Sequence, residues 1–352
     1  MSEQQTRSSR RAWLLIGAIA VALIVGLGVI VGYPSNNPDP SPPSTSPPTT
    51  GQEPRGVEVL DEASLTVPQT LRSANGSFDT VQGQKYLLRF EVSTMKPEGS
   101  AGAAMYLGVS LNCVGEGGGR TRSIGGTQNL VTGEPTTLSN QFVLVGGGEA
   151  QSCNVSMSAP YDEVAAAGVT IEADVRWSAQ PIDPSSFEIS AEERLPTEVP
   201  VGGRELAFTR TIDLDEVRGR SVNVFGTLHL TACTGVNGSR EDGKTWCDAT
   251  TADSGGSEVD LVLRADLLDA EGRPCGEVAV QADALHIDRF THHRLTTFSH
   301  EAVVPEDACG VSLRFSLTVA TQGPAPVVVH SSASSFVVVN GEFRGEGNLE
   351  TD

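Results

Sequence analysis

The chain has 352 residues, and its 24 Lys and Arg residues against 44 Asp and Glu residues give a net charge of −20. A surface this acidic lacks the positive footprint that nucleic acids and anionic lipid headgroups require, so the composition excludes nucleic-acid binding as an expected function. The length is sufficient for two domains after any membrane segment has been set aside.

Residues 12–32 are apolar and uncharged, and they follow a leader, residues 1–11, that contains Arg7, Arg10 and Arg11. As a helix this segment would be about 31 Å long, which matches the hydrocarbon core of a bilayer. The positive-inside rule places the leader in the cytoplasm and the rest of the chain outside. A cleaved signal peptide has a shorter apolar region and a small-residue cleavage site. Twin-arginine signals have a less strongly apolar region and usually a cleavage site. We therefore expect an uncleaved single-pass anchor.

A proline-rich tether is expected at residues 33–55, where eight prolines alternate mainly with Ser, Thr and Asn. This composition favours an extended polyproline II conformation of about 3.1 Å per residue, so the tether could hold the rest of the chain up to about 65 Å from the membrane. We interpret it as a spacer through a cell-wall layer, although a flexible stalk would have a similar composition.

Alternating apolar and polar residues dominate the remainder and predict an all-β ectodomain of two antiparallel β-sandwich or jelly-roll-like domains. We expect the first domain at 56–182, a linker at 183–203, a second domain at 204–340 and a disordered acidic tail at 341–352. The alternation predicts strands at 86–92, 104–111, 141–145, 153–157 and 169–177 in the first domain, and at 221–232, 258–268, 277–287, 294–304, 311–320 and 334–339 in the second.

Six cysteines, all beyond the expected anchor, predict three disulfides in an exported protein. The domain boundaries and sequence proximity favour three pairs: Cys113 with Cys153, Cys233 with Cys247, and Cys275 with Cys309. In both halves a second cysteine opens an alternating strand, which suggests a duplicated sandwich with the same two strands joined in each copy. A zinc site built from cysteines is not expected, because the sequence has no C-x-x-C pair.

Two sets of residues are candidates for ligand binding. His286, Asp288 and His293 lie close together in sequence and are of types that ligate divalent metal ions, although solvent-facing strand histidines would give the same pattern. Trp246, in a polar loop beside Cys247, is the one aromatic residue that we expect to be exposed, and it could stack on a sugar ring.

No arrangement of paired carboxylates, phosphate-binding glycines or Cys/His nucleophile is evident, so we expect no catalytic residues and no cofactor. The leading interpretation is a single-pass, cell-surface protein that displays two disulfide-bonded sandwiches for binding, adhesion or a structural role. Its partners would be the membrane and either cell-wall polysaccharide or another envelope protein. An envelope hydrolase and an accessory subunit of a membrane complex are the alternatives.

Overall fold

The computed structural model describes most of the expected ectodomain, and the expected leader, anchor, tether and most of the acidic tail lie outside the described residues. Within the described residues, no helix is long and apolar enough to cross a bilayer. The described ranges are 56–100, 104–115, 122–159, 168–189, 194–234, 239–241, 244–247, 255–288, 291–331 and 334–341.

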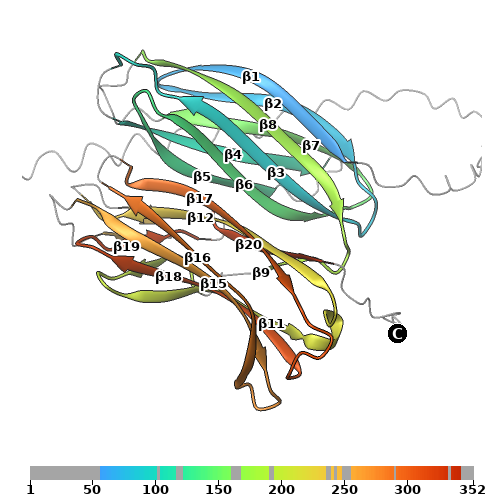
Figure 1. The fold of residues 1–352 in the computed structure, drawn as a ribbon. Helices are drawn as coiled ribbons and strands as arrows, with labels where there is room; N and C mark the ends of the chain where they lie inside the picture. The colour runs from blue at the N-terminus through green and yellow to red at the C-terminus, as the bar shows by residue number, and fades with distance from the viewer. Residues whose placement is uncertain are drawn as a thin grey trace, which may run out of the picture. The chain divides into compact units, whose positions relative to one another are not determined.

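The first half contains eight long strands (Figure 1). They are β1 (Val57–Thr66), β2 (Gln69–Asp79), β3 (Lys85–Met95), β4 (Ala104–Gly115), β5 (Arg122–Val131), β6 (Pro135–Val145), β7 (Ala150–Ala159) and β8 (Thr170–Ile182).

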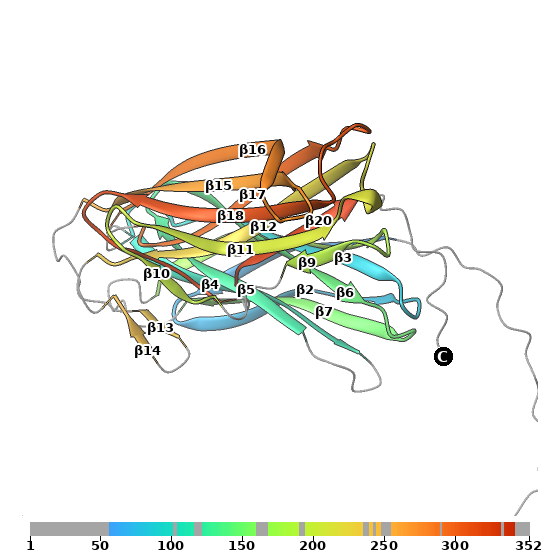
Figure 2. The same ribbon diagram turned by 90° about the horizontal axis from the view of Figure 1, so that it is seen from below.

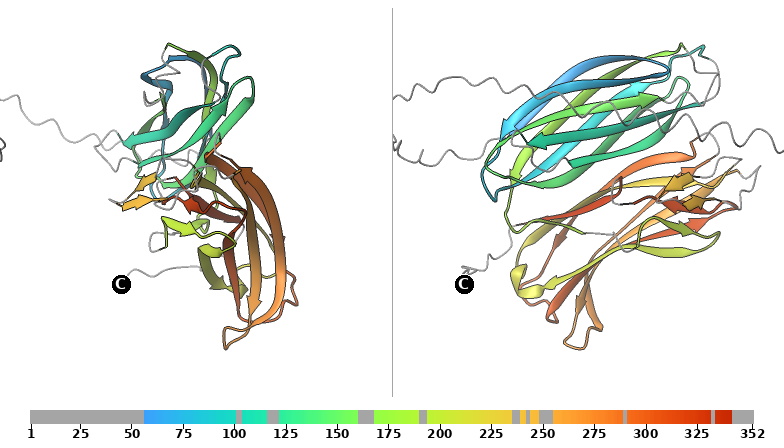
Figure 3. Two further views of the ribbon diagram at one scale, coloured as in Figure 1. Left: turned by 90° about the vertical axis from the view of Figure 1, so that its left-hand side faces the viewer. Right: turned by 180° about the vertical axis from the view of Figure 1, so that it is seen from behind.

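These strands form two antiparallel four-stranded sheets, in the orders β1-β8-β3-β6 and β2-β7-β4-β5, which stack as two layers (Figures 1 and 3). This strand order is that of an eight-stranded jelly roll. The alternation seen in the sequence explains the core: in β8, Ile171, Ala173, Val175 and Trp177 are buried, and the residues that alternate with them face outward. The Trp177 ring donates a hydrogen bond of 2.5 Å to the carbonyl of Ala74, so its only polar atom is satisfied inside the core.

The described residues of the second half form twelve strands and one short 3-10 turn, Leu214–Glu216. The strands are β9 (Phe187–Ile189), β10 (Thr197–Val199), β11 (Arg204–Asp213), β12 (Ser221–Ala232), β13 (Ser239–Glu241), β14 (Lys244–Trp246), β15 (Ser257–Leu268), β16 (Pro274–Ile287), β17 (His293–Val303), β18 (Ser312–Gln322), β19 (Val327–Val329) and β20 (Phe336–Gly341).

The second half has the topology of the first. One sheet runs β11-β18-β15-β16, and the other joins β9 and β10 through β20 and β19 to β12, whose other neighbour is β17 (Figure 2). We count β9 with β10 as one interrupted strand, and β19 with β20 as another. Apart from the β13–β14 hairpin, each strand of the second half then has a counterpart in the first jelly roll, in the same order. The small β13–β14 hairpin stands off from both sheets (Figure 2). A shared eight-strand order supports the duplication suggested by the sequence.

The segment expected as a linker, residues 183–203, belongs instead to the second jelly roll. It supplies β9 and β10, which pair with β20 and β19. Ile189, Leu195 and Val199 from this segment are buried in the second core. Prolines and acidic residues hid these short strands, because they suppress the alternation that longer strands show.

The six cysteines form the three pairs that the sequence predicts, and no described cysteine is free. The expectation that each domain is joined at equivalent strands is not met. Cys113 on β4 and Cys153 on β7 are directly paired across neighbouring strands. Cys275, by contrast, lies at the start of β16 and Cys309 in the loop before β18. These two disulfides therefore occupy different places in the same topology.

The two jelly rolls meet where β5 contacts β17. As an outer strand of its sheet, β17 has backbone N–H groups that need partners. Asn129 accepts a hydrogen bond from the N–H of His293 at 2.7 Å, and Gln128 accepts one from the N–H of Leu295 at 3.2 Å. Both side chains are buried, and the Leu295 side chain packs into the core of the first jelly roll.

An ion pair reinforces this junction. Arg122 on β5 lies 2.6 Å from Glu188 on β9, and the same guanidinium donates to the carbonyl of Val143. Glu188 in turn accepts from the N–H of Val143 at 2.5 Å. Because both charged groups are half-buried and bonded to backbone as well as to each other, they fix the position of β9 against β6.

Candidate functional site

Three histidines from different strands lie together beside the junction. His229 is on β12, His293 begins β17, and His330 directly follows β19. The β12–β17 register places His293 opposite Thr231, two residues from His229 and therefore on the same face of the sheet. The backbone N–H of His330 donates to the carbonyl of His229 at 3.0 Å, which brings the third ring to this face.

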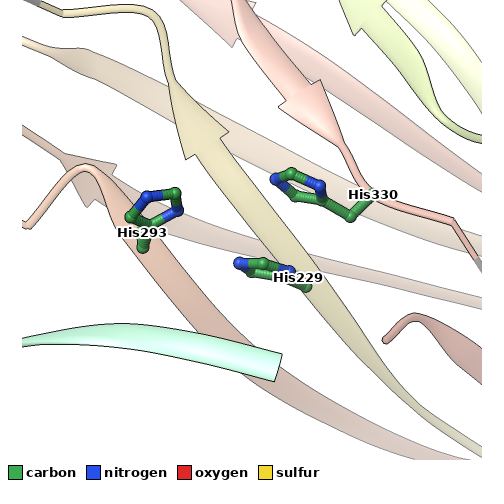
Figure 4. A group of neighbouring side chains, drawn as sticks. All are labelled: His229, His293 and His330. Atoms are coloured by element: carbon green, nitrogen blue, oxygen red, sulfur yellow. The ribbon is translucent and has the colours of Figure 1, made fainter. Parts of the chain in front are cut away.

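The three imidazole rings, here called the histidine cluster, face a shared space next to β12 (Figure 4). One ring nitrogen from each lies within 4.8 Å of the others, and within the described ranges this is the one group of three metal-ligating side chains so close together. The rings of His229 and His330 are stacked, with centroids 4.0 Å apart and planes at 16°. His292 contacts the cluster through His293, at a centroid distance of 4.4 Å.

The environment keeps His229 and His293 uncharged. Burial lowers the pKa of His229 well below its usual value, and the neighbouring rings of His330 and His293 lower it further. Burial likewise lowers the pKa of His293, as do His292 and His330. Since a positive charge on either of these two rings would be poorly solvated, both are neutral near pH 7.

Threonine hydroxyls fix the orientation of the rings. Thr231 Oγ1 lies 2.8 Å from Nδ1 of His293 and 2.6 Å from Nε2 of His330. Thr127 Oγ1, from β5 of the first jelly roll, lies 2.7 Å from Nε2 of His229. A hydroxyl that accepts a ring N–H leaves the other nitrogen of that ring with its lone pair free, which is the form that binds a metal ion.

The histidine cluster stands at one end of a groove of about 650 Å³ over the outer face of sheet β2-β7-β4-β5, here called the groove. None of the described residues that line it is Asp, Glu, Lys or Arg. Apart from the three histidines, it is lined by hydroxyl-bearing residues, glycines and one apolar residue: Thr70, Tyr106, Gly108, Val109, Ser110, Ser123, Gly125, Gly126, Thr127, Ser156, Ser158 and Ser334.

Two glycines of β5 allow neighbouring segments to pack closely beside this face. A Cβ on Gly125 would lie 2.3 Å from the carbonyl oxygen of Val109, and one on Gly126 would lie 2.5 Å from Leu295, so neither position accepts a side chain without movement. The one large aromatic ring on the groove wall is Tyr106, which makes an edge contact with His293 at a centroid distance of 5.0 Å. A ligand in the groove would therefore meet hydroxyl groups, the backbone of the glycines and the ring of Tyr106.

The corresponding face of the second jelly roll, over sheet β11-β18-β15-β16, has a different chemistry. Arg264 pairs with Glu277 at 3.1 Å across β15 and β16, and Arg314 pairs with Asp266 at 3.0 Å across β18 and β15. Charged pairs of this kind are typical of a solvated sheet face. Two faces with the same topology have thus acquired different surfaces.

A second cleft, of about 450 Å³, lies where β3 and β6 meet β12 and β17. Its charged groups are engaged within the protein: Arg176 forms an ion pair of 2.7 Å with Glu91, and Arg89 stacks over the ring of Phe225 at 5.1 Å. These contacts use the groups that a ligand would need, so we regard this cleft as part of the junction.

The structure separates the predicted metal ligands. His293 is in the histidine cluster, whereas His286 and Asp288 are not. His286 is exposed on β16, with Nδ1 2.8 Å from Oε1 of Glu258, and the Asp288 carboxylate accepts from the N–H of Thr291 at 2.7 Å. Proximity in sequence selected these two residues, but neighbours across a sheet come from distant segments. Trp246 ends β14 opposite Ser239, and its side chain lies outside the described part of the chain.

His229 and His330 were not predicted from the sequence. Their contribution depends on β12 pairing with both β17 and β19, and nothing in the spacing of single histidines reveals such pairing. The alternation in 221–232 did place His229 on a strand, which is the only local signal available.

No protein-family model matches the sequence, and no curated protein matches it. Several solved structures match over most of the chain, all with low TM-scores. A tandem CBM22 pair from Paenibacillus barcinonensis Xyn10C is 11% identical, over 82% of this chain and 94% of that chain, with a TM-score of 0.25. An infectious bursal disease virus Gt strain structure is 14% identical, over 86% and 74%, with a TM-score of 0.30. A peptide-N(4)-(N-acetyl-β-D-glucosaminyl) asparagine amidase is 9% identical, over 81% and 100%, with a TM-score of 0.27. Scores this low carry no argument about what this chain binds, so the function has to be argued from its own geometry.

Proposed function

We propose that this protein is a cell-surface binding protein that holds a neutral, hydroxyl-rich polymer, such as a cell-wall polysaccharide, in the groove of its first jelly roll. The observation that carries the proposal is the lining of the groove: apart from the histidine cluster, it consists mainly of hydroxyl-bearing residues, including Tyr106, and glycines, and its described residues include no Asp, Glu, Lys or Arg. Sugars are bound by hydrogen bonds to such groups and by stacking on aromatic rings.

The pattern of hydrogen bonds on this face supports the proposal. Ser123 donates to Asn112 at 2.7 Å, Asn112 donates to Ser156 at 3.1 Å, and Thr70 donates to Ser158 at 3.3 Å. These contacts link β5, β4 and β7, and link β2 to β7, and a hydroxyl that donates to a neighbour keeps oxygen lone pairs that can accept from a ligand, so acceptors remain across the width of the face. A polymer with a hydroxyl on every ring can bond repeatedly to such acceptors.

The lining of the groove fits a binding protein better than it fits an envelope hydrolase. Glycosidases use a pair of carboxyl groups about 5 to 10 Å apart on either side of the scissile bond. The described lining residues of the groove include no Asp or Glu. We therefore propose a binding role rather than a catalytic one.

The proposed location is the outer side of the cell membrane, with residues 12–32 as a single-pass anchor and the N-terminus in the cytoplasm. Three disulfides support an extracellular site for the jelly rolls, because disulfides persist in oxidising compartments. Protease treatment of intact cells tests this directly. The jelly rolls should be cut off and released, and protection of the chain in intact cells would contradict it.

Native gel electrophoresis through immobilised polysaccharide tests the binding. We expect a neutral glucan, mannan or galactan to retard the full-length chain, and polygalacturonic acid not to, because the protein has a net charge of −20. Tyr106→Ala should weaken retardation about tenfold, in line with the loss of one aromatic contact. Ser158→Trp should abolish it by filling the groove.

The second jelly roll offers a matched control. Ser316 lies on β18, the counterpart of β7, and is half-buried as Ser158 is. Ser316→Trp should leave the retardation unchanged. Equal loss with Ser158→Trp and Ser316→Trp, or no retardation of the unaltered chain by any of the neutral polymers, would refute the proposed site.

A further inference from the structure

We propose that the histidine cluster, His229, His293 and His330, binds one divalent transition-metal ion of the zinc class at the junction of the two jelly rolls. Imidazole nitrogens are preferred ligands of Zn²⁺, Cu²⁺ and Ni²⁺, and three of them leave one coordination position open. This inference does not rest on the polysaccharide proposal, because it concerns the end of the groove and a different ligand.

The positions of the rings are close to those a metal needs. Tetrahedral Zn²⁺ with bonds of about 2.0 to 2.1 Å brings its ligand nitrogens about 3.4 Å apart. In the structure, the three ligand atoms lie within 4.8 Å of one another, so closing around an ion requires shifts of about 1 Å. Side-chain rotation supplies shifts of this size without moving the strands.

One ring has to turn. The lone pairs of two rings stacked at 4.0 Å, with planes 16° apart, lie in two separate and nearly parallel planes, so they cannot both point at one ion. His330 is the ring best placed to move, because it lies beyond the end of β19 while His229 lies within β12. The backbone bond from His330 to the His229 carbonyl would remain. Binding should therefore break the stack but keep the sheet.

The surroundings favour the metal-binding form. Thr231, in contact with Nδ1 of His293, supplies an outer hydrogen bond of the kind that orients a ligating imidazole. The groove gives an ion a path to the cluster, and the net charge of −20 attracts cations.

Calorimetric titration of the chelator-treated full-length chain, without a histidine tag and in mild detergent, tests the proposal. We expect one Zn²⁺ ion per chain, with no comparable binding of Mg²⁺. His293→Gln and His330→Gln should each weaken Zn²⁺ binding at least 100-fold. Thr231→Val should weaken it about tenfold, as loss of an outer hydrogen bond does at other sites.

His286→Gln and His300→Gln are the matched controls, since both remove a histidine outside the cluster. They should leave the affinity unchanged. Because His293 and His330 could also matter for folding, circular dichroism of each variant should show retained β-structure, and Zn²⁺ should raise the Tm of the unaltered chain but not of His293→Gln. Failure of the unaltered chain to bind Zn²⁺, Cu²⁺ or Ni²⁺, or loss of binding in His286→Gln instead, would overturn the proposal.

Discussion

Thr127 Oγ1 lies 2.7 Å from Nε2 of His229, so a hydroxyl on β5 of the first jelly roll contacts the histidine cluster carried by the second. This contact couples the groove to the junction, because Thr127 also lines the groove. Valine has the shape of threonine but lacks its hydroxyl. Thr127→Val would therefore keep the shape of the groove wall and remove the hydrogen bond to His229.

Thr127→Val should lower the free energy of unfolding by about 1 to 3 kcal/mol, because the buried Nε2 of His229 loses its hydroxyl partner. Urea denaturation of the full-length chain measures this. Thr137→Val is the control, since its hydroxyl contacts Ser93 at an exposed site and should cost less than about 0.5 kcal/mol. Equal effects of the two substitutions would show that the contact with His229 does not stabilise the junction.

Asn129→Ala should speed the hydrogen exchange of backbone amides at the junction of the two jelly rolls. The N–H of His293, which donates to Asn129, would lose its buried acceptor at a cost of about 1 to 3 kcal/mol. Hydrogen exchange followed by mass spectrometry should then show faster exchange in β17 and unchanged exchange in β8. Unchanged exchange in β17 would mean that Asn129 does not protect its backbone.

Stability should fall as the pH drops below about 6.5. In the unfolded chain a histidine titrates near pH 6.5, while the folded pKa of His229 is lowered by burial and by the rings of His330 and His293. Between these two values the unfolded state binds more protons, so acid favours unfolding by up to about 1.4 kcal/mol per pH unit for this residue. The Thr127 hydroxyl contacts the His229 ring directly, and His292 and Tyr106 contact the neighbouring ring of His293.

Urea denaturation at pH 7.5, 6.5 and 5.5 measures this dependence. His229→Gln should reduce the slope between pH 6.5 and 5.5, because glutamine does not titrate. His300→Gln, on β17 outside the cluster, should leave it unchanged. An unaltered slope in His229→Gln would contradict the lowered pKa of this residue.

Removing the Cys113–Cys153 disulfide should destabilise the protein more than removing the Cys233–Cys247 disulfide. On the chain-entropy model, the Cys113–Cys153 bond, with a separation of 40 residues, stabilises by about 4 kcal/mol, and the Cys233–Cys247 bond, with a separation of 14, by about 3 kcal/mol. Replacing each pair by alanines and measuring Tm should give the larger decrease for the first pair. The reverse order would show that packing around the small β13–β14 insertion outweighs loop closure.

Much of the fold could be predicted from alternation alone. The range 221–232 coincides with β12, and predicted strands overlap β3, β4, β6, β7 and β8 in the first half. β1, β2 and β5 were not predicted, the last two for local reasons. A bulge between Ser73 and Gly76 interrupts the period of β2, and the Gly125–Gly126 pair leaves β5 without side chains to alternate.

The candidate site was less accessible to prediction from the sequence. Cysteine pairs could be assigned because few alternatives exist within a domain, whereas the histidine cluster draws on residues 229, 293 and 330, which only strand pairing brings together. The groove is built from Ser, Thr and Gly, which in sequence resemble ordinary surface residues. The groove becomes recognisable as a candidate site when it is compared with the equivalent face of the second jelly roll, which carries charged pairs.

The central claim is that the outer face of sheet β2-β7-β4-β5 holds a neutral polysaccharide. Hydrogen exchange of the full-length chain, with and without the polysaccharide that retards it most, tests this directly. The account predicts slower exchange in β4 and β5 on binding, and no change in β15 and β18, which occupy the equivalent sheet of the second jelly roll. Protection confined to β15 and β18, or unchanged exchange in β4 and β5 when the polymer is bound, would contradict it.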